Sequence, residues 1–159
     1  DAAMTTMRVP DVLTVRAGEG LTLLVRFKGE AERRVDLASW VADVAALRPL
    51  RDPAFLATAR VAYGGGGVAW GEVTGEDGEG PIDMSGELLW RLAGEQTGEL
   101  MPLAAFRAWR ERHGLSVPEA ARTLGISPRM AAYYESGAWP IPKTVMLACE
   151  GVDARRAAA

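Results

Sequence analysis

The residue types that most often perform catalysis are scarce in this sequence. His113 is the single histidine and Cys149 the single cysteine, so a Ser-His-Asp or Cys-His arrangement would depend on one side chain of each type. These two residues cannot build the usual His and Cys sites for metal ions. We expect His113, which precedes a glycine, at the end of a helix, and Cys149 as a small buried side chain on an apolar helix face. Carboxylate enzymes are the main catalytic class that this inventory leaves open.

Two further segments of the first half could hold a ligand. The run Gly64–Gly67 could cradle a phosphate, but no Gly-Lys-Ser/Thr follows it, so we expect a hairpin turn between the strands that Ala59–Tyr63 and Val68–Val73 predict. An acidic, glycine-rich segment follows at Glu72–Gly80. Four nearby carboxylates could bind a divalent cation, although their spacing does not match a calcium loop and favours a solvated loop: Glu76, Asp77, Glu79 and Asp83.

These observations predict a protein without catalytic residues, metal site or cofactor. Trp70 and Trp90 could stack on a ligand, but core packing is the more common role of such residues. The chain of 159 residues is 48 % hydrophobic and 25 % charged, which fits one or two small globular domains. No segment approaches the roughly 20 apolar residues of a membrane span. A lone cysteine excludes a disulfide within the chain and indicates a cytoplasmic protein.

Charge divides the chain into two parts. Residues 1–99 contain ten basic and sixteen acidic residues, a balance of −6, whereas residues 100–159 contain eight and five, a balance of +3. Different charges suggest two modules with different surfaces. The positive balance of the second part is compatible with contacts to phosphate, although it is modest for a nucleic-acid binder.

Short strands and helices should position the first module. Apolar and β-branched residues predict a strand at Val12–Arg16, and apolar residues at every second position predict one at Leu21–Phe27. A third strand is expected at Arg33–Leu37, and the tight turns between the three indicate an antiparallel meander. Apolar residues at helical spacing predict helices at Ala38–Leu47 and Ser85–Ala93. We therefore expect a small α+β domain built on an antiparallel sheet.

Helix start and stop signals dominate the second part. An amphipathic helix is predicted at Pro102–His113, and the glycine after it ends the helix. Ser116 and Glu119 form a capping box for the next helix, which ends at Gly125. Ser127 then caps a third helix, because its hydroxyl can accept a hydrogen bond from the first-turn amides. A final helix is expected from Lys143 to about Glu150.

Two short helices joined through a glycine form a helix-turn-helix geometry. The residues that give this segment a family resemblance are Gly114-Leu115-Ser116, Glu119-Ala120-Ala121-Arg122, Leu124-Gly125-Ile126-Ser127, Tyr134-Glu135-Ser136-Gly137 and Pro140-Ile141-Pro142. The segment resembles the Xre/Cro (lambda-repressor-like) helix-turn-helix domain over residues 100–152. The resemblance implies an all-α domain that binds double-stranded DNA through helix 127–136, and a homodimer that reads two-fold half-sites.

The resemblance also assigns the residues that would face the DNA bases. They are Pro128, Arg129, Ala132 and Tyr133. Arg129 is the one that could make a bidentate contact to guanine, which is worth about 1–3 kcal/mol of discrimination. Tyr133 could donate to a phosphate or contact a thymine methyl group. The chain has no asparagine and one glutamine, Gln96, so this helix cannot read adenine with a side-chain amide.

The chain offers more groups for contacts to phosphate than for contacts to bases. In related domains Arg122, Arg129 and Lys143 lie on segments that flank the groove, and the helix amides near Ser116 and Ser127 add donors. We expect three more arginines on the first helix to extend this basic face: Arg107, Arg110 and Arg112.

The first module has a looser resemblance of its own. It is similar to a bacterial family of small α+β domains, sometimes fused to an Xre-type tail, to which no activity is assigned. The matching residues are Val35-Asp36-Leu37, Leu47 to Phe55, Val61 and Gly67 to Trp70. The resemblance implies an α+β domain over residues 8–95 and no particular reaction.

The sequence therefore favours a DNA-binding transcriptional regulator with two domains. The first domain would supply dimerisation, an effector surface or contact with a partner protein. An alternative is a protein-interaction module whose helix-turn-helix no longer reads DNA, with Met130, Tyr133 and Trp139 as contact residues. A third hypothesis, an enzyme that uses carboxylates of the first domain, requires two acids that converge in a pocket.

Overall fold

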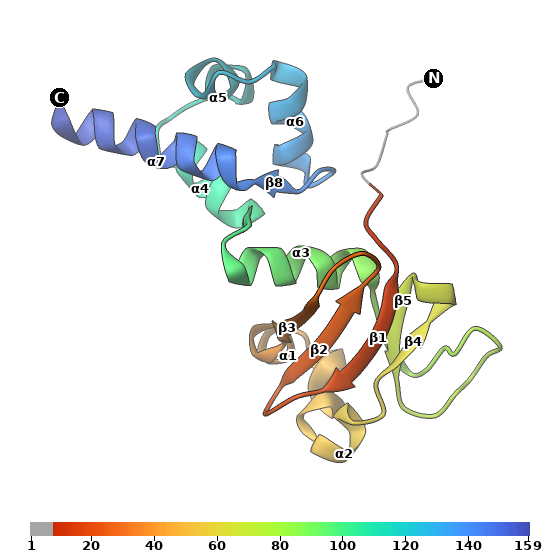
Figure 1. Ribbon diagram of the computed structural model, residues 1–159. Coiled ribbons are helices and arrows are strands. Elements are labelled where there is room, and N and C mark those ends of the chain that lie inside the picture. Colours follow the sequence, from red (N-terminus) through yellow and green to blue (C-terminus); the bar gives the residue numbers. More distant parts are fainter. Residues whose placement is uncertain (1–7) are drawn as a thin grey trace. The chain divides into compact units, whose positions relative to one another are not determined.

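The computed structural model describes residues 8–159 and shows a mixed α+β protein with small antiparallel sheets and several helices (Figure 1). The chain divides into two compact units, residues 9–96 and residues 97–159, here called the N-terminal unit and the C-terminal unit. Within the described part of the chain, no helix is both long and apolar enough to cross a membrane.

The first sheet of the N-terminal unit is the predicted meander. Strands β1 (Val12–Ala17), β2 (Thr22–Phe27) and β3 (Glu32–Asp36) pair antiparallel in the order β1-β2-β3. Side chains alternate between the two faces of a strand, and one face of this sheet is apolar and fully buried. The residues with no exposed surface on that face include Leu23, Val25, Phe27 and Val35.

A second sheet forms around the run of four glycines. Strand β4 (Arg60–Ala62) pairs antiparallel with β5 (Gly67–Trp70), and a short 3₁₀ turn, η2 (Tyr63–Gly65), joins them. The hairpin prediction is therefore confirmed. The sequence analysis did not predict β6 (Ile82–Ser85), which pairs with β5 on its other side, because only two of its four residues are apolar.

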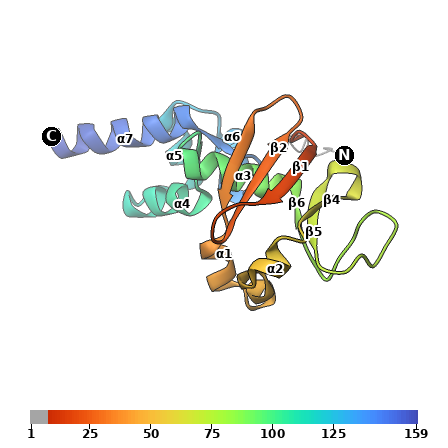
Figure 2. The same cartoon turned by 60° about the horizontal axis from the view of Figure 1, so that its bottom comes forward.

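Four helical segments complete the N-terminal unit. The helix predicted at residues 38–47 is shorter, because Val44 takes an extended conformation and separates α1 (Ala38–Asp43) from a 3₁₀ segment, η1 (Ala45–Arg51). Helix α2 (Pro53–Leu56) follows, and α3 (Gly86–Thr97) is longer than predicted. Figure 2 shows α3 behind the strands of the first sheet, whose core it shares.

One hydrophobic core holds the N-terminal unit together. Trp70 is fully buried, and Leu89 and Ala93 of α3 join the same cluster as the apolar face of the first sheet. The core role expected for Trp70 is therefore confirmed. Trp90 packs against this cluster while its indole N–H donates to Glu30 Oε1 at 3.1 Å.

The C-terminal unit is mainly helical. Its helices agree with the predicted order, and the last one runs beyond Glu150. The prediction of an all-α domain omits a ladder of two short strands, whose two residues each are too few to produce a periodic pattern. The elements are β7 (Leu100–Met101), α4 (Leu103–Arg112), α5 (Val117–Leu124), α6 (Pro128–Ser136), β8 (Ile141–Pro142) and α7 (Lys143–Ala158), with β7 and β8 antiparallel.

The predicted helix caps are present. Glu119 N–H donates to the Ser116 hydroxyl at 3.3 Å, and Ser116 N–H donates to Glu119 Oε2 at 2.8 Å, so the capping box of α5 is complete. These bonds lower the pKa of Glu119. Ser127 accepts from Met130 N–H at 3.1 Å, and Gly125 ends α5 with φ at +75°, a conformation that favours glycine.

A polar cluster fastens α4 to α7. Asp153 Oδ1 lies 2.6 Å from His113 Nε2 and accepts from Trp109 Nε1 at 3.1 Å, while Oδ2 accepts from Arg112 at 3.0 Å. On the other side of the ring, Arg156 NH1 lies 2.6 Å from His113 Nδ1. Because arginine can only donate, Nδ1 accepts and Nε2 carries the proton that Asp153 accepts. The hydrogen bond from His113 is the largest cause of the lowered pKa of Asp153.

Alanine substitutions at two glycines of the C-terminal unit are predicted to change stability in opposite directions. An added Cβ would meet no atom within 4 Å at Gly125 or Gly151, so only backbone conformation distinguishes the two sites. We expect Gly125→Ala to destabilise the protein by roughly 1–2 kcal/mol, because its φ is left-handed, and Gly151→Ala, inside α7, to stabilise it by about 0.5–1 kcal/mol. Urea unfolding followed by circular dichroism measures both, and effects of equal sign would contradict the assigned backbone.

The lowered pKa of Asp153 predicts an acid-sensitive helix contact. A depressed carboxyl pKa stabilises the fold at pH values above the unfolded pKa of about 3.9, and this contribution is lost as the pH falls through the folded pKa. We therefore expect Asp153→Asn to lower Tm at about pH 6 and to have a smaller effect at about pH 3. Asp43→Asn, which changes an exposed carboxylate on α1, is the control. A Tm difference for Asp153→Asn that is independent of pH would show that the ion pairs contribute nothing.

Candidate nucleic-acid interface

Helices α5 and α6 form a closely packed pair. Ala120, Ala121 and Ala131 have no exposed surface, and their small side chains let the two helix backbones approach. The left-handed Gly125 reverses the chain between the helices, and Ile126 N–H donates to Ala121 O at 3.0 Å. The turn is therefore fixed by backbone hydrogen bonds and leaves the first turn of α6 exposed.

On the exposed side of α6, Tyr133 contacts two other side chains, Arg129 and Trp139. Arg129 Nε donates to the Tyr133 hydroxyl at 2.8 Å, and its guanidinium carbon lies 5.6 Å from the centre of the Tyr133 ring. Tyr133 also stacks on Trp139, with ring centroids 6.1 Å apart and planes at 23°. Stacking restricts the side-chain rotamers, so Arg129 and Tyr133 are held in place before any ligand arrives.

The same arrangement leaves part of Arg129 available. Its two terminal nitrogens make no hydrogen bond to any described residue, and the side chain is exposed. A guanidinium with two free parallel donors is the group that reads guanine or binds a phosphate by two hydrogen bonds. Pro128 and Ala132 are also exposed but bring no polar side-chain atom.

The arginines of α4 all have partners within the C-terminal unit. Arg110 binds the Glu135 carboxylate through two bonds, Nε to Oε2 at 3.0 Å and NH2 to Oε1 at 2.8 Å. Arg107 donates to the Glu135 carbonyl at 2.7 and 3.1 Å, and Arg112 binds Asp153. Each of the three binds a partner within the unit, so the expectation that they extend the basic face stays a prediction.

The remaining predicted cations make no salt bridge to a carboxylate among the described residues, although the charge of Arg122 contributes to the lowered pKa of Glu119. Arg122 on α5 and Lys143 at the start of α7 are exposed, and neither makes a hydrogen bond or ion pair within residues 8–159. Ser116 and Ser127 are exposed as well, but their hydroxyl oxygens accept helix amides. Arg155 near the end of α7 is exposed as well, and Arg107 and Arg156 bond an uncharged carbonyl oxygen and a ring nitrogen. Exposed positive charge in the C-terminal unit thus lies on α5, α6 and the start of α7, and also on α4 and the end of α7.

The sequence did not reveal the contacts that two residues of this surface make. Glu135 was seen as part of a motif, and only the structure shows that it anchors α6 to α4. Trp139 was considered as a surface contact, and its stack on Tyr133 joins residues from a helix and from the loop that follows it. The aromatic residue six positions after Tyr133 was the available signal, but contacts between a helix and a loop have no fixed spacing.

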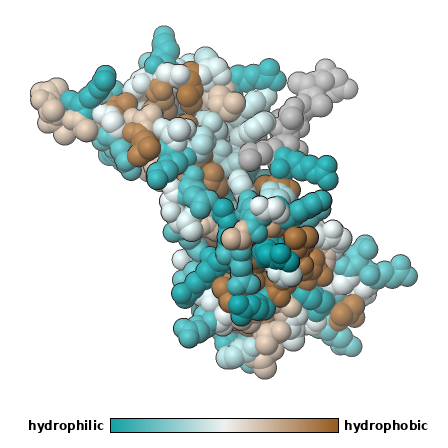
Figure 3. Space-filling model, viewed as in Figure 1, coloured by the Kyte–Doolittle hydropathy of each residue, from teal (hydrophilic) through white to brown (hydrophobic). Residues whose placement is uncertain are grey.

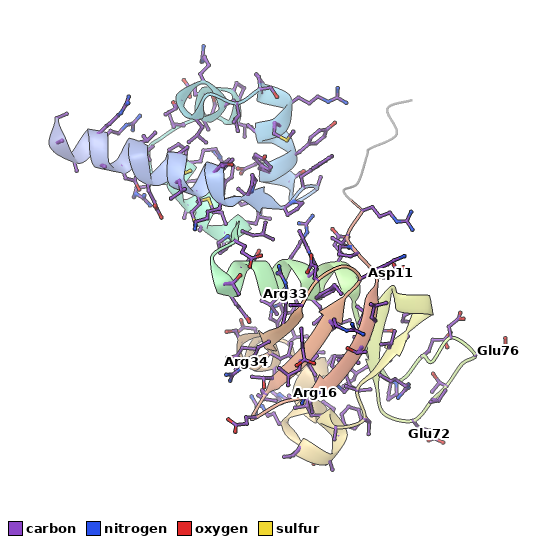
Figure 4. The ribbon with its side chains drawn as sticks, in the orientation of Figure 1. Asp11, Arg16, Arg33, Arg34, Glu72 and Glu76 are labelled. Atoms are coloured by element: carbon purple, nitrogen blue, oxygen red, sulfur yellow. The ribbon has the colours of Figure 1, made fainter. Side chains whose placement is uncertain are left out.

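The acidic loop of the N-terminal unit is a second charged feature. Arg60 holds the loop by donating to three backbone carbonyls, Gly78 at 2.8 Å, Gly71 at 2.5 Å and Glu79 at 2.9 Å. Glu72 and Glu76 project from the loop into solvent (Figure 4). Among the described residues no cluster of three or more potential ligands could hold a metal ion, so the loop presents negative charge on a fixed backbone.

Comparison with known proteins gives one similar structure. No protein-family model and no curated protein matches the sequence. The chain is similar to a crystal structure from Nitrosomonas europaea ATCC 19718, whose protein is named "Putative DNA Binding Protein", with 29 % sequence identity and a TM-score of 0.54. The similarity covers 93 % of this chain and 89 % of that one. It therefore includes most of both units, and the fold of this chain recurs in a protein named for DNA binding.

Proposed function

We propose that the C-terminal unit is an Xre/Cro-like helix-turn-helix that binds double-stranded DNA in a cytoplasmic transcriptional regulator. Helices α5 and α6 would be the two helices of the motif, with the start of α6 in the major groove. The observation that carries the proposal is the distribution of cations. Carboxylates hold Arg110 and Arg112 in salt bridges, whereas Arg122, Arg129 and Lys143 are exposed and make no salt bridge within residues 8–159.

The three exposed cations differ in the groups of DNA that they can bind. Arg122 and Lys143 are single positive charges without a fixed partner, suited to phosphates and to any base sequence. Arg129 is held by Tyr133 and offers two parallel donors, which suits a guanine edge. The similar protein from Nitrosomonas europaea, named for DNA binding, supports a DNA-binding role for the chain and does not bear on the roles of single residues. The N-terminal unit would supply dimerisation or the surface for an effector or partner protein.

A second candidate function is supported by the same helix. Pro128 and Ala132 bring no hydrogen-bonding side chain to the exposed side of α6, and Tyr133 and Trp139 form a stacked aromatic pair beside them. Aromatic residues are enriched in protein interfaces. A partner protein bound through this apolar and aromatic side would be held with less dependence on salt than DNA, whose binding must weaken steeply as salt rises.

The phosphate contacts predict a salt dependence that can be measured. We expect fluorescence anisotropy with a labelled duplex from the chain's own upstream region to show binding that weakens strongly between about 50 and about 200 mM salt. Arg122→Ala and Lys143→Ala should each weaken binding to all duplexes and reduce the salt slope by about one. Arg48→Ala removes the same charge from the exposed surface of η1 and should change neither. Binding that is absent even at about 50 mM salt would refute the DNA-binding proposal.

The guanine contact predicts a change in specificity. We expect Arg129→Ala to lower affinity for the upstream duplex by about 1–3 kcal/mol and to lower affinity for a scrambled duplex much less. Tyr133→Phe keeps the ring and removes the hydroxyl that Arg129 contacts, so its effect should be smaller and in the same direction. Equal losses on both duplexes would assign Arg129 to phosphate and would leave base reading to other groups.

A further inference from the structure

The outer edge of β3 is an unusual feature of the N-terminal unit. Strand β3 lies at the end of the first sheet and pairs only with β2 among the described elements (Figure 1). Leu37 N–H donates to Leu21 O at 2.8 Å on the β2 side. Backbone groups of successive residues in a strand point to opposite sides, so those of Glu32, Arg34 and Asp36 point away from β2, toward the open edge.

One end of this edge is closed by a side chain. Asp36 N–H donates to Gln96 Oε1 at 2.8 Å, and Gln96 Nε2 donates to Asp36 O at 2.7 Å. The amide of Gln96, the single glutamine of the chain, therefore occupies the place that a neighbouring strand would take. This pair of bonds also confirms that the backbone of Asp36 points outward.

The rest of the edge remains open. No other described residue bonds the backbone of Glu32 or Arg34 on this side, and both side chains are exposed. Exposed edges of this kind pair with another strand unless something blocks them. Glu32 and Arg34 project from the outer face, where Leu24 and Arg26 are their partners on β2. Figure 3 shows mainly hydrophilic residues over this part of the molecule.

We propose that the open edge pairs with β3 of a second copy of this chain, antiparallel and centred on Arg33. In this register Glu32 of each copy lies opposite Arg34 of the other, and the outward backbone groups of these residues exchange hydrogen bonds. Opposite charges directly across two strands stabilise the pair. The occupant is thus selected by self-complementarity of backbone and charge, and the result is one sheet across two copies.

Two neighbouring registers that the backbone permits bring like charges of the exposed face together, and a register centred on Val35 requires the backbone of Asp36, which Gln96 already occupies. A register centred on Glu32 places the two Glu32 side chains opposite each other, and one centred on Arg34 does the same for Arg34. Like charges directly opposite are destabilising. In the register centred on Arg33, the turn that precedes β3 in the second copy lies opposite Asp36 of the first copy. Gln96 already closes the edge at Asp36, so no further pairing is needed there. The open length of β3 therefore matches the two-fold arrangement.

The remaining charges at the edge are compatible with this pairing. The two copies of Arg33 would face each other, but each is already in an ion pair with Glu30 of its own chain at 3.1 Å. Glu32 contacts Arg16 through Oε1 at 3.0 Å, which leaves Oε2 for the incoming Arg34. Figure 4 labels Arg16, Arg33 and Arg34 on the strands concerned.

The mass of the full-length protein in solution tests the proposal. Size-exclusion chromatography with light scattering should give twice the 17.0 kDa of one chain. Glu32→Arg and Arg34→Glu should each shift the protein to the monomer, because each places like charges opposite. The double variant Glu32→Arg/Arg34→Glu should restore the dimer. Arg48→Glu makes the same change of charge as Arg34→Glu on an exposed residue of η1 and should leave the dimer intact.

A backbone variant tests the hydrogen bonds directly. Arg34→Pro removes an N–H that points away from β2, so the β2–β3 ladder persists, and the variant should be monomeric with Arg34→Ala as its control for the lost side chain. Circular dichroism melts check that each variant is folded. A monomeric wild type, a dimer unchanged by Arg34→Pro, or a double variant that stays monomeric would each overturn the proposal. Because mass is measured without DNA, a failure of DNA binding leaves this result unaffected.

Discussion

The two-point contact between Arg110 and Glu135 is the interaction on which the candidate interface depends. The guanidinium bonds both carboxylate oxygens, and its NH1 donates to Leu115 O at 2.9 Å. One side chain of α4 therefore holds the segment that leads into α5 and the end of α6. Both partners are about four-fifths buried, with 19 % and 20 % of each side chain exposed, so water screens the pair less than a surface pair. Arginine's planar fork makes this geometry possible, and lysine could not reproduce it.

Charge pairing inside the C-terminal unit also determines which charges remain outside. Glu135 and Asp153 bind most of the arginines that α4 contributes, and the capping carboxylate of Glu119 is used at the start of α5. Arg122 on α5, Arg129 on α6 and Lys143 at the start of α7 are left exposed without a salt bridge among the described residues. A small positive net charge can therefore produce a locally basic surface, because Glu119, Glu135 and Asp153 bind groups within the unit.

The N-terminal unit differs from the C-terminal unit in where its charged residues lie. Its charges sit on a loop fixed by Arg60 and on the outer face and edge of a small sheet, while a fully buried tryptophan and the apolar strand face form the core. An open strand edge is a hazard unless it is closed or used. Gln96 closes one end of it, and the opposite charges of Glu32 and Arg34 favour the self-pairing about Arg33 that we propose.

Local signals in the sequence determined the caps, the turns and most of the elements. Ser116, Ser127 and Gly125 act within four residues of their own position, so their roles could be read from spacing, and the alternation of β1 and β2 fixed the buried face. The tertiary structure alone decided the break at Val44, the two-residue strands and the partners of the arginines. Those outcomes depend on contacts between residues far apart in the chain, such as Arg110 with Glu135 and Asp36 with Gln96. No periodicity records such contacts, because the fold and not the spacing brings the groups together.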